Sequence, residues 1–317
     1  MVPKDRLKTG ESPLINMKAV KNEIEVEGAR KAHIRDSVAL CALFKKMEEE
    51  IPNGIQWDEL KVAEVLDQFR KDYGENLYRG PSFKTIAAFG AHAALPHYVS
   101  SPDTNIAVDT SAAMTLDSGG QYLDGTIDTT RVLHFGNPTN FEIDIYTSLL
   151  QGVIDLADTV FPAAVPVSSL EILIRRPLFK LGLTFTHGIT HGTGIFSNVH
   201  EDFNRTYFEN FIGSQEPGYY LKDKLGMRLE NLVVVVKAPV QNEANPAPLL
   251  TFSPLTLVPY ELKLTNVSKL DFREISWLNN YHATVLEVVG NEMIKKGYQE
   301  LYKWLEVKTK SVKKVCE

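Results

Sequence analysis

The chain has 317 residues, 44% hydrophobic and 23% charged, which is the ordinary balance of a globular protein. A net charge of -6 provides no basic footprint, so we expect no nucleic acid and no membrane surface among its partners. No uncharged apolar run approaches the roughly 20 residues of a membrane helix. Two cysteines, Cys41 and Cys316, make no disulfide framework, and the first residues lack a signal-peptide core. These features predict a reducing, cytoplasmic location.

The first half of the sequence predicts two helices followed by strands. Residues 1–20 are polar and typical of a linker or a residual N-terminal segment. Apolar residues recur at helical intervals over 21–50, and a second helix is expected over Trp57–Tyr73, after the breaker Pro52-Asn53-Gly54. Residues 81–134 are rich in glycine, threonine and short apolar stretches, which favour strands and hairpins.

The second half of the sequence again predicts helices followed by strands. Thr139 with Glu142 matches a capping box and predicts a helix to about residue 160. A similar pattern, Ser168 with Glu171, predicts a helix over 168–182 that Pro177 kinks.

The remaining elements are strands and one long helix. Residues 228–236 and 249–264 favour strands. Asp271 with Glu274 predicts a last helix through about Leu305, and the lysine-rich residues 307–317 predict a disordered tail. Helices that flank β-rich segments twice indicate an α/β (α+β) class, with one folded domain over 21–306.

Two carboxylates stand out in LDSGGQYLDGTIDTTR, residues 116–131. Asp117 and Asp128 lie in expected strands, separated by a glycine-rich stretch that can fold them back against each other. Neighbouring carboxylates repel, and a hard divalent cation relieves that repulsion. A hairpin with polar edges is the alternative.

Histidines are concentrated in THGITHGTGIFSNVHE, residues 186–201. His187 and His191 would share one face of a helix as metal ligands, but the interspersed glycines disfavour a helix. We therefore expect His191 and His200 to reach one site from extended backbone. The alternative for each histidine is a buried ring that a hydrogen bond satisfies.

Two glutamates complete the set of candidate ligands. Glu216 precedes a Pro-Gly turn. Glu230 lies at the start of the apolar strand that contains four consecutive valines. A carboxylate there is costly unless it is paired or coordinated. Pairing with Arg228 is the alternative for Glu230, and solvation is the alternative for Glu216.

Together, two Asp, one His and two Glu offer mixed oxygen and nitrogen ligation. That set suits two ions of Mn²⁺ or Zn²⁺, with Co²⁺ as a third candidate, better than a structural zinc. Two such ions would activate a water and stabilise the oxyanion of a tetrahedral intermediate.

The order and spacing of these segments resemble the pita-bread metallopeptidases, the fold of methionine aminopeptidase, prolidase, creatinase and aminopeptidase P. Within that group the chain is most similar to eukaryotic cytosolic aminopeptidase P. The segments that carry the resemblance are EVEGARKAHIRDSVALC, PSFKTIAAFG, DSGGQYLDGTIDTTR, HFGNPT, LTFSPLTLVPYELK and WLNNYH. The resemblance implies two halves of curved antiparallel sheet, flanked by helices and related by a pseudo-twofold.

The resemblance also implies roles for individual residues. Asp117 would bind one metal, His191 and Glu216 the second, and Asp128 and Glu230 would bridge both. Glu216 would also shuttle the proton of the reaction. The remaining catalytic positions would hold the substrate without binding metal: His97, His187 and His200.

The implied function is hydrolysis of the N-terminal Xaa-Pro bond by a metal-bound hydroxide. Its substrates would be short peptides with proline second, and a homodimer is left open. The alternatives are a prolidase-like dipeptidase and a pita-bread pseudoenzyme that acts as a binding module.

Several positions depart from the family pattern. GITHGTG replaces GTGHGVG around His191, residues 202–214 are shortened, and Gln215 stands where Asp is common. Members of the branch carry two domains before the catalytic one, where about twenty residues stand here, so we expect a more open site.

Overall fold

The structure is a computed structural model that describes residues 3, 6, 10, 12–240 and 247–314. Within those residues the helices are α1 (Pro13–Ala19), α2 (Glu23–Glu50), α3 (Glu59–Tyr73), α4 (Asn140–Ala157), α5 (Val167–Phe179), α6 (Phe272–Lys295) and α7 (Gln299–Lys308). Short 3₁₀ turns are η2 (Gly90–Ala94), η3 (Leu262–Leu264) and η4 (Val267–Lys269). The strands are β1 (Trp57–Asp58), β2 (Tyr78–Pro81), β3 (Ile86–Phe89), β4 (Ala107–Val108), β5 (Ala113–Ser118), β6 (Gly120–Tyr122), β7 (Gly125–Thr126), β8 (Thr129–His134), β9 (Phe161–Pro162), β10 (Ile212–Gln215), β11 (Gly218–Leu221), β12 (Leu225–Arg228), β13 (Asn231–Lys237) and β14 (Leu249–Pro254).

All strand pairs among the described residues are antiparallel. The orders are β3-β5-β8 and β2-β6-β7 in the first half, and β10-β13-β14-β9 and β11-β12 in the second, with β1-β4 at the periphery. An isolated antiparallel bridge pairs Thr130, near the start of β8, with Glu230, directly before β13. The two halves therefore meet at Glu230, one of the candidate metal ligands.

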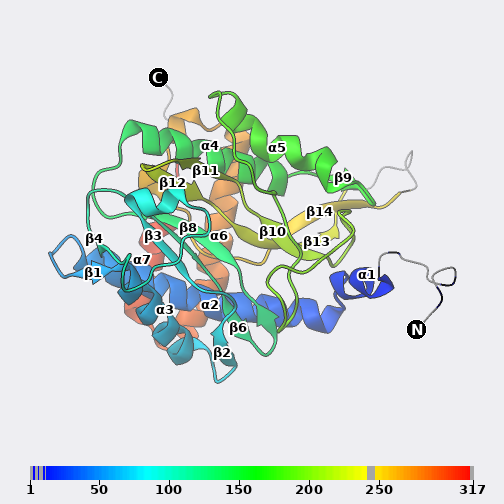
Figure 1. Ribbon diagram of the computed structural model, residues 1–317, viewed down its shortest axis with the longest axis horizontal. Helices are drawn as coiled ribbons and strands as arrows, with labels where there is room; N and C mark the ends of the chain where they lie inside the picture. Colours follow the sequence, from blue (N-terminus) through cyan, green and yellow to red (C-terminus); the bar gives the residue numbers. More distant parts are fainter. Residues whose placement is uncertain (1–2, 4–5, 7–9, 11, 241–246, 315–317) are drawn as a thin grey trace.

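Helices cover both sides of these strands (Figure 1). In that view α4 and α5 lie above the strands, α2 and α3 lie below, and α6 runs behind them. Apolar residues of α4, β13 and α6 form the largest core, and its members include Leu149, Ile154, Val233, Leu278 and Val285. This core holds the second half of the strands against α4 and α6 by burial of apolar surface.

Most predicted helices are confirmed, with sharper limits. A capping box of Asn22 and Glu25 starts α2, and the predicted box of Thr139 and Glu142 starts α4. The second predicted helix begins at Glu59, because Trp57 and Asp58 pair with β4 and Asp58 caps the helix.

Other helix predictions are wrong in detail. Helix α5 begins at Val167 after Pro166 with no side-chain cap, so the box of Ser168 and Glu171 does not form. Pro177 lies inside α5, which ends at Phe179. The predicted last helix is two helices, because Gly297 adopts a φ of +80° between α6 and α7.

Two further predictions need correction. Of residues 249–264, only Leu249–Pro254 is a strand. The tail predicted to be disordered begins inside α7, Thr309 is buried, and the Val312 N–H donates to Asn279. Residues 315–317, including Cys316, lie outside the described residues. No helix in the described ranges combines the length and the apolar character needed to cross a bilayer.

Candidate metal centre

The hairpin of β5 and β8 places the first two carboxylates. Asp117 pairs with Thr130 in the register of these strands, and Asp128 lies one residue before β8. Gly119 permits this fold-back, because a Cβ there would lie 1.7 Å from the carbonyl oxygen of Ile127. The glycine-rich stretch between the carboxylates thus has a steric reason, as the sequence suggested.

Glu230 reaches the same place from the second half of the chain. Its N–H donates to the Thr130 carbonyl at 3.1 Å, and the Thr130 hydroxyl donates to Glu230 Oε2 at 2.8 Å. Thr130 therefore fixes both the backbone and the side chain of Glu230 beside Asp117.

Glu216 and His191 are held together through Ser214. The Ser214 hydroxyl accepts the His191 N–H at 3.0 Å and donates to Glu216 Oε1 at 3.1 Å. The Glu216 N–H also donates to the Ile189 carbonyl at 3.0 Å, so the irregular segment before His191 runs beside β10. An extended, glycine-punctuated backbone carries the histidine, as expected.

The His191 ring faces three carboxylates. Its Nε2 lies 3.3 Å from Asp128 Oδ2, 3.5 Å from Glu230 Oε1 and 3.6 Å from Glu216 Oε1. Its Nδ1 lies 3.0 Å from the Gly192 carbonyl, so Nδ1–H can donate a hydrogen bond to that oxygen, and Nε2 is directed at the carboxylates.

A cavity of about 510 Å³ contains the whole candidate set. Its lining includes all eight residues singled out from the sequence: His97, Asp117, Asp128, His187, His191, His200, Glu216 and Glu230. Its apolar wall includes Phe83, Ile86 and Val99. The structure thus brings every predicted site residue together.

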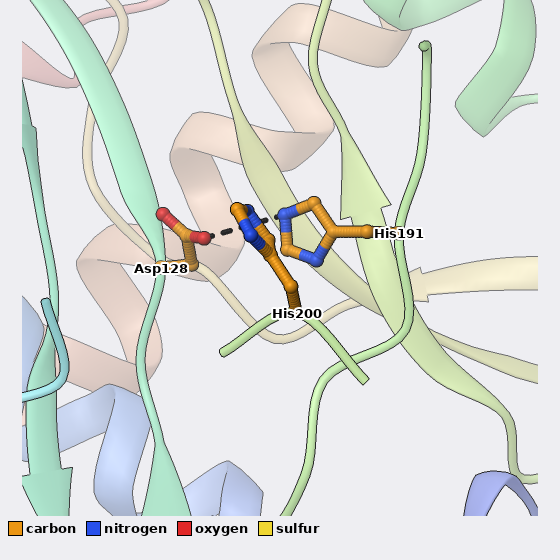
Figure 2. Close-up of side chains that lie close together, drawn as sticks. All are labelled: Asp128, His191 and His200. Carbon is orange, nitrogen blue, oxygen red and sulfur yellow. Dashed lines mark ion pairs between the residues drawn. The ribbon is translucent and has the colours of Figure 1, made fainter. Parts of the chain in front are cut away.

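The three histidines expected to contact substrate differ in their surroundings. His187 is oriented by the Gly188 carbonyl at 2.8 Å and by the Tyr220 hydroxyl at 3.0 Å. The His200 ring lies 4.4 Å from that of His191, beside Asp128 (Figure 2). Asp128, His191 and His200 each offer a ligand atom within 4.8 Å of the others, so geometry alone places His200 within reach of a metal.

Burial and mutual repulsion dominate the electrostatics. Burial, reinforced by Glu230, raises the pKa of Asp128 well above its usual value and that of Glu216 to about 8. Burial opposes charge on His191, yet Asp128 and Glu230 together raise its pKa to about 12. Burial also raises the pKa of Asp117, although Arg228 opposes this. Without an added cation, the raised pKa values therefore favour the protonated, neutral forms of Asp128 and Glu216.

Arg228 and Tyr220 are the site residues whose roles the sequence did not reveal. Arg228 was the alternative partner for Glu230, but it forms its ion pair with Asp117 instead. It also donates to the Tyr220 hydroxyl at 2.6 Å. No local sequence pattern could have revealed this ion pair, because Arg228 and Asp117 are 111 residues apart in the chain.

The donor set fits two divalent cations. Asp117 Oδ1 and Glu230 Oε1 are buried without a hydrogen-bond partner among the described residues, although such atoms are costly when unpaired. Four carboxylates around one imidazole supply the oxygen-rich, mixed ligation of a two-metal site. These two oxygens are the atoms for which a cation would provide the missing partner.

Comparison with known proteins identifies the family. The sequence matches metallopeptidase family M24 over residues 27–237, and the C-terminal region of peptidase M24 over residues 248–312. The chain belongs to metallopeptidase family M24.

The relatives within M24 include named aminopeptidases. Xaa-Pro aminopeptidase 2 from Homo sapiens is 39% identical over 316 residues, which cover 98% of this chain and 46% of that protein. A probable Xaa-Pro aminopeptidase P from Arthroderma benhamiae is 42% identical over 277 residues, covering 87% of this chain and 39% of that protein. The chain spans about half the length of the curated relatives it matches, or less.

Solved structures confirm the M24 fold. An X-prolyl aminopeptidase from Caenorhabditis elegans, described as a cytosolic enzyme with a di-nuclear active site, has a TM-score of 0.90 at 38% identity. That match covers 95% of this chain and 50% of the other. A prolidase from Pyrococcus horikoshii has a TM-score of 0.61 at 24% identity, over 78% of this chain and 65% of the other, and shows the fold alone. The pita-bread fold and the resemblance to aminopeptidase P are confirmed.

Proposed function

We propose that this M24 chain is a dinuclear metal-dependent aminopeptidase that hydrolyses the bond between an N-terminal residue and a following proline. The observation that carries the proposal is the convergence of five ligand-type side chains on one cavity. Support comes from relatives at 38–39% identity whose names specify Xaa-Pro or X-prolyl aminopeptidase activity. The prolidase alternative rests on weaker likeness, at 24% identity.

The proposed ligand set combines five residues that line the cavity with the roles that the family resemblance implies for them. Asp117 would hold one ion, His191 and Glu216 would hold the other, and Asp128 and Glu230 would bridge the two. Mn²⁺ or Zn²⁺ suits this set, with Co²⁺ as a third candidate. Two such ions, when bound, lower the pKa of a water and polarise the scissile carbonyl.

The chain's own residues then position the substrate and move the proton. Glu216, held by Ser214, takes a proton from the attacking water and delivers it to the prolyl nitrogen. An Xaa-Pro bond has no amide N–H, so an enzyme that recognises that donor is handicapped, whereas this arrangement does not need it. His97, His187 and His200 hold the peptide near the scissile carbonyl and donate to the oxygen as charge develops there.

The substrate class we propose is short peptides with proline in the second position. The cavity has an apolar wall for a side chain or ring beside a charged centre. A cytoplasmic location is supported by the C. elegans relative described as cytosolic. A homodimer stays a prediction.

Comparing two peptides tests this proposal. Purified protein reconstituted with Mn²⁺ or Zn²⁺ should release free arginine from Arg-Pro-Pro, hydrolyse Gly-Pro more slowly, and lose both activities on chelation. Preference for Gly-Pro would indicate a prolidase-like dipeptidase. Two bound metals with peptide binding but no cleavage would indicate a binding module.

A further inference from the structure

A buried ion pair outside the cavity adjoins its histidine side. Lys21 lies in the link between α1 and α2, and its ammonium group donates to the carboxylate of Glu201. The same nitrogen donates to the carbonyls of Lys18 and Ala19, at 3.0 and 3.3 Å. Neither Lys21 nor Glu201 lines the cavity.

Glu201 connects this pair to the proposed metal ligand. Its N–H donates to the Gly192 carbonyl at 2.7 Å, and the same carbonyl lies 3.0 Å from Nδ1 of His191. Glu201 also directly follows His200, whose ring packs on that of His191. One residue thus anchors the segments of both histidines.

Lys21 is itself firmly placed. Its N–H donates to the Asn210 carbonyl at 3.0 Å, and Val20 pairs with Phe211 in a β-bridge. The nearby Lys18 lies 3.7 Å from Glu201 but its side chain is 60% exposed, so water screens its charge. Loss of Lys21 would therefore leave the buried Glu201 carboxylate without an equivalent cation.

We infer that Lys21 is a positioning residue for the proposed metal site: through Glu201 and the Gly192 carbonyl, it fixes the ring orientation that directs His191 Nε2 at Asp128, Glu216 and Glu230. The inference rests on the proposed metal-binding function. Partners that orient a metal-binding histidine typically contribute about 10–100-fold to metal affinity.

Calorimetric titration of the metal-free protein with Mn²⁺ tests the inference. Lys21→Met should weaken binding of one of two Mn²⁺ ions by about tenfold or more. Lys21→Arg, which keeps a cation facing Glu201, should recover part of that loss. Lys308→Met is the matched control, because it breaks a largely buried pair with Glu48 and Glu261 outside the cavity lining. It should lower thermal stability and leave Mn²⁺ affinity unchanged.

A double variant keeps the test decisive if Lys21→Met fails to fold. Lys21→Met with Glu201→Leu replaces the pair by apolar side chains and leaves no unpaired buried charge. Weakened Mn²⁺ binding in this folded variant would support the inference, and wild-type affinity in it would overturn the inference. A wild-type protein that binds no Mn²⁺ would instead contradict the proposed function.

Discussion

Arg228 supplies the cation that a buried cluster of four carboxylates needs before any metal binds. It pairs with Asp117, donates to Tyr220 and contacts the Pro96 carbonyl at 3.2 Å. Burial alone would oppose its charge, yet Asp117, Tyr220 and Glu230 hold its pKa well above the usual value. Arg228 therefore both stabilises the metal-free fold and orients one proposed ligand.

Replacing Arg228 with Met should lower the unfolding free energy of the metal-free protein by about 3 kcal/mol or more, because Asp117 would keep a buried charge without its partner. Urea denaturation after chelation measures this. Arg228→Lys keeps the charge and should lose less. Equal stability of the Met variant and the wild type would show that Asp117 does not depend on this pair.

His200 has two interpretations that one substitution separates. As a substrate-binding residue, His200→Ala should lower kcat by about a hundredfold, the typical cost of removing one donor to a developing oxyanion, with two metals still bound. Elemental analysis of the variant decides between the interpretations. Loss of a metal would mean that His200 joins Asp128 and His191 as a ligand, which their proximity allows.

At the scale of elements, the β5–β8 hairpin depends on Gly119. A methyl group there meets the Ile127 carbonyl, so Gly119→Ala should force β5 and β8 apart at the end that carries the carboxylates. We expect metal content to fall below two equivalents. Gly54→Ala is the control: its φ of +81° makes it strained, but nothing lies within 4 Å. That variant should lose about 1 kcal/mol of stability and keep its metals.

Sequence patterns predicted the helices whose start or buried face is determined by residues close together in the chain. The capping box at Thr139 and the helical period of apolar residues in α2 are both satisfied within one helix. The matching pattern at Ser168 fails because Pro166 already precedes the first turn and the helix begins one residue earlier. The break at Gly297 was missed because residues on both sides of it continue the helical pattern.

The residues of the site could be predicted from the sequence, but the contacts between its distant segments could not. Residue types and motif order, with the family resemblance, identified all eight predicted residues of the cavity. The pairing of Arg228 with Asp117 and the bond from Thr130 to Glu230 join segments about a hundred residues apart. Register between the two halves fixes these contacts, and no local pattern encodes that register.

At the scale of the whole molecule, the metal-free fold should become less stable as pH rises. Burial and Glu230 raise the pKa of Glu216 from 4.5 to about 8, so the folded state holds this proton more tightly than the unfolded state does. The stabilisation from that proton is complete below about pH 4.5 and is lost as pH rises through about 8.

Comparison with Glu216→Gln isolates this contribution. Between about pH 5 and 8, chelated wild type should lose on the order of a few kcal/mol of unfolding free energy relative to the Gln variant. Urea denaturation at each pH measures the difference. Parallel pH profiles would show that Glu216 is ionised throughout in the metal-free protein.

The most direct test of the central claim is the rate of arginine release from Arg-Pro-Pro as Mn²⁺ is added stepwise to the chelated protein. A dinuclear enzyme should show activity that rises to a plateau at two equivalents per chain, and Asp128→Asn should abolish that rise because it removes the proposed bridging carboxylate. Cleavage that persists after chelation, or no cleavage at any Mn²⁺ level, would contradict the account.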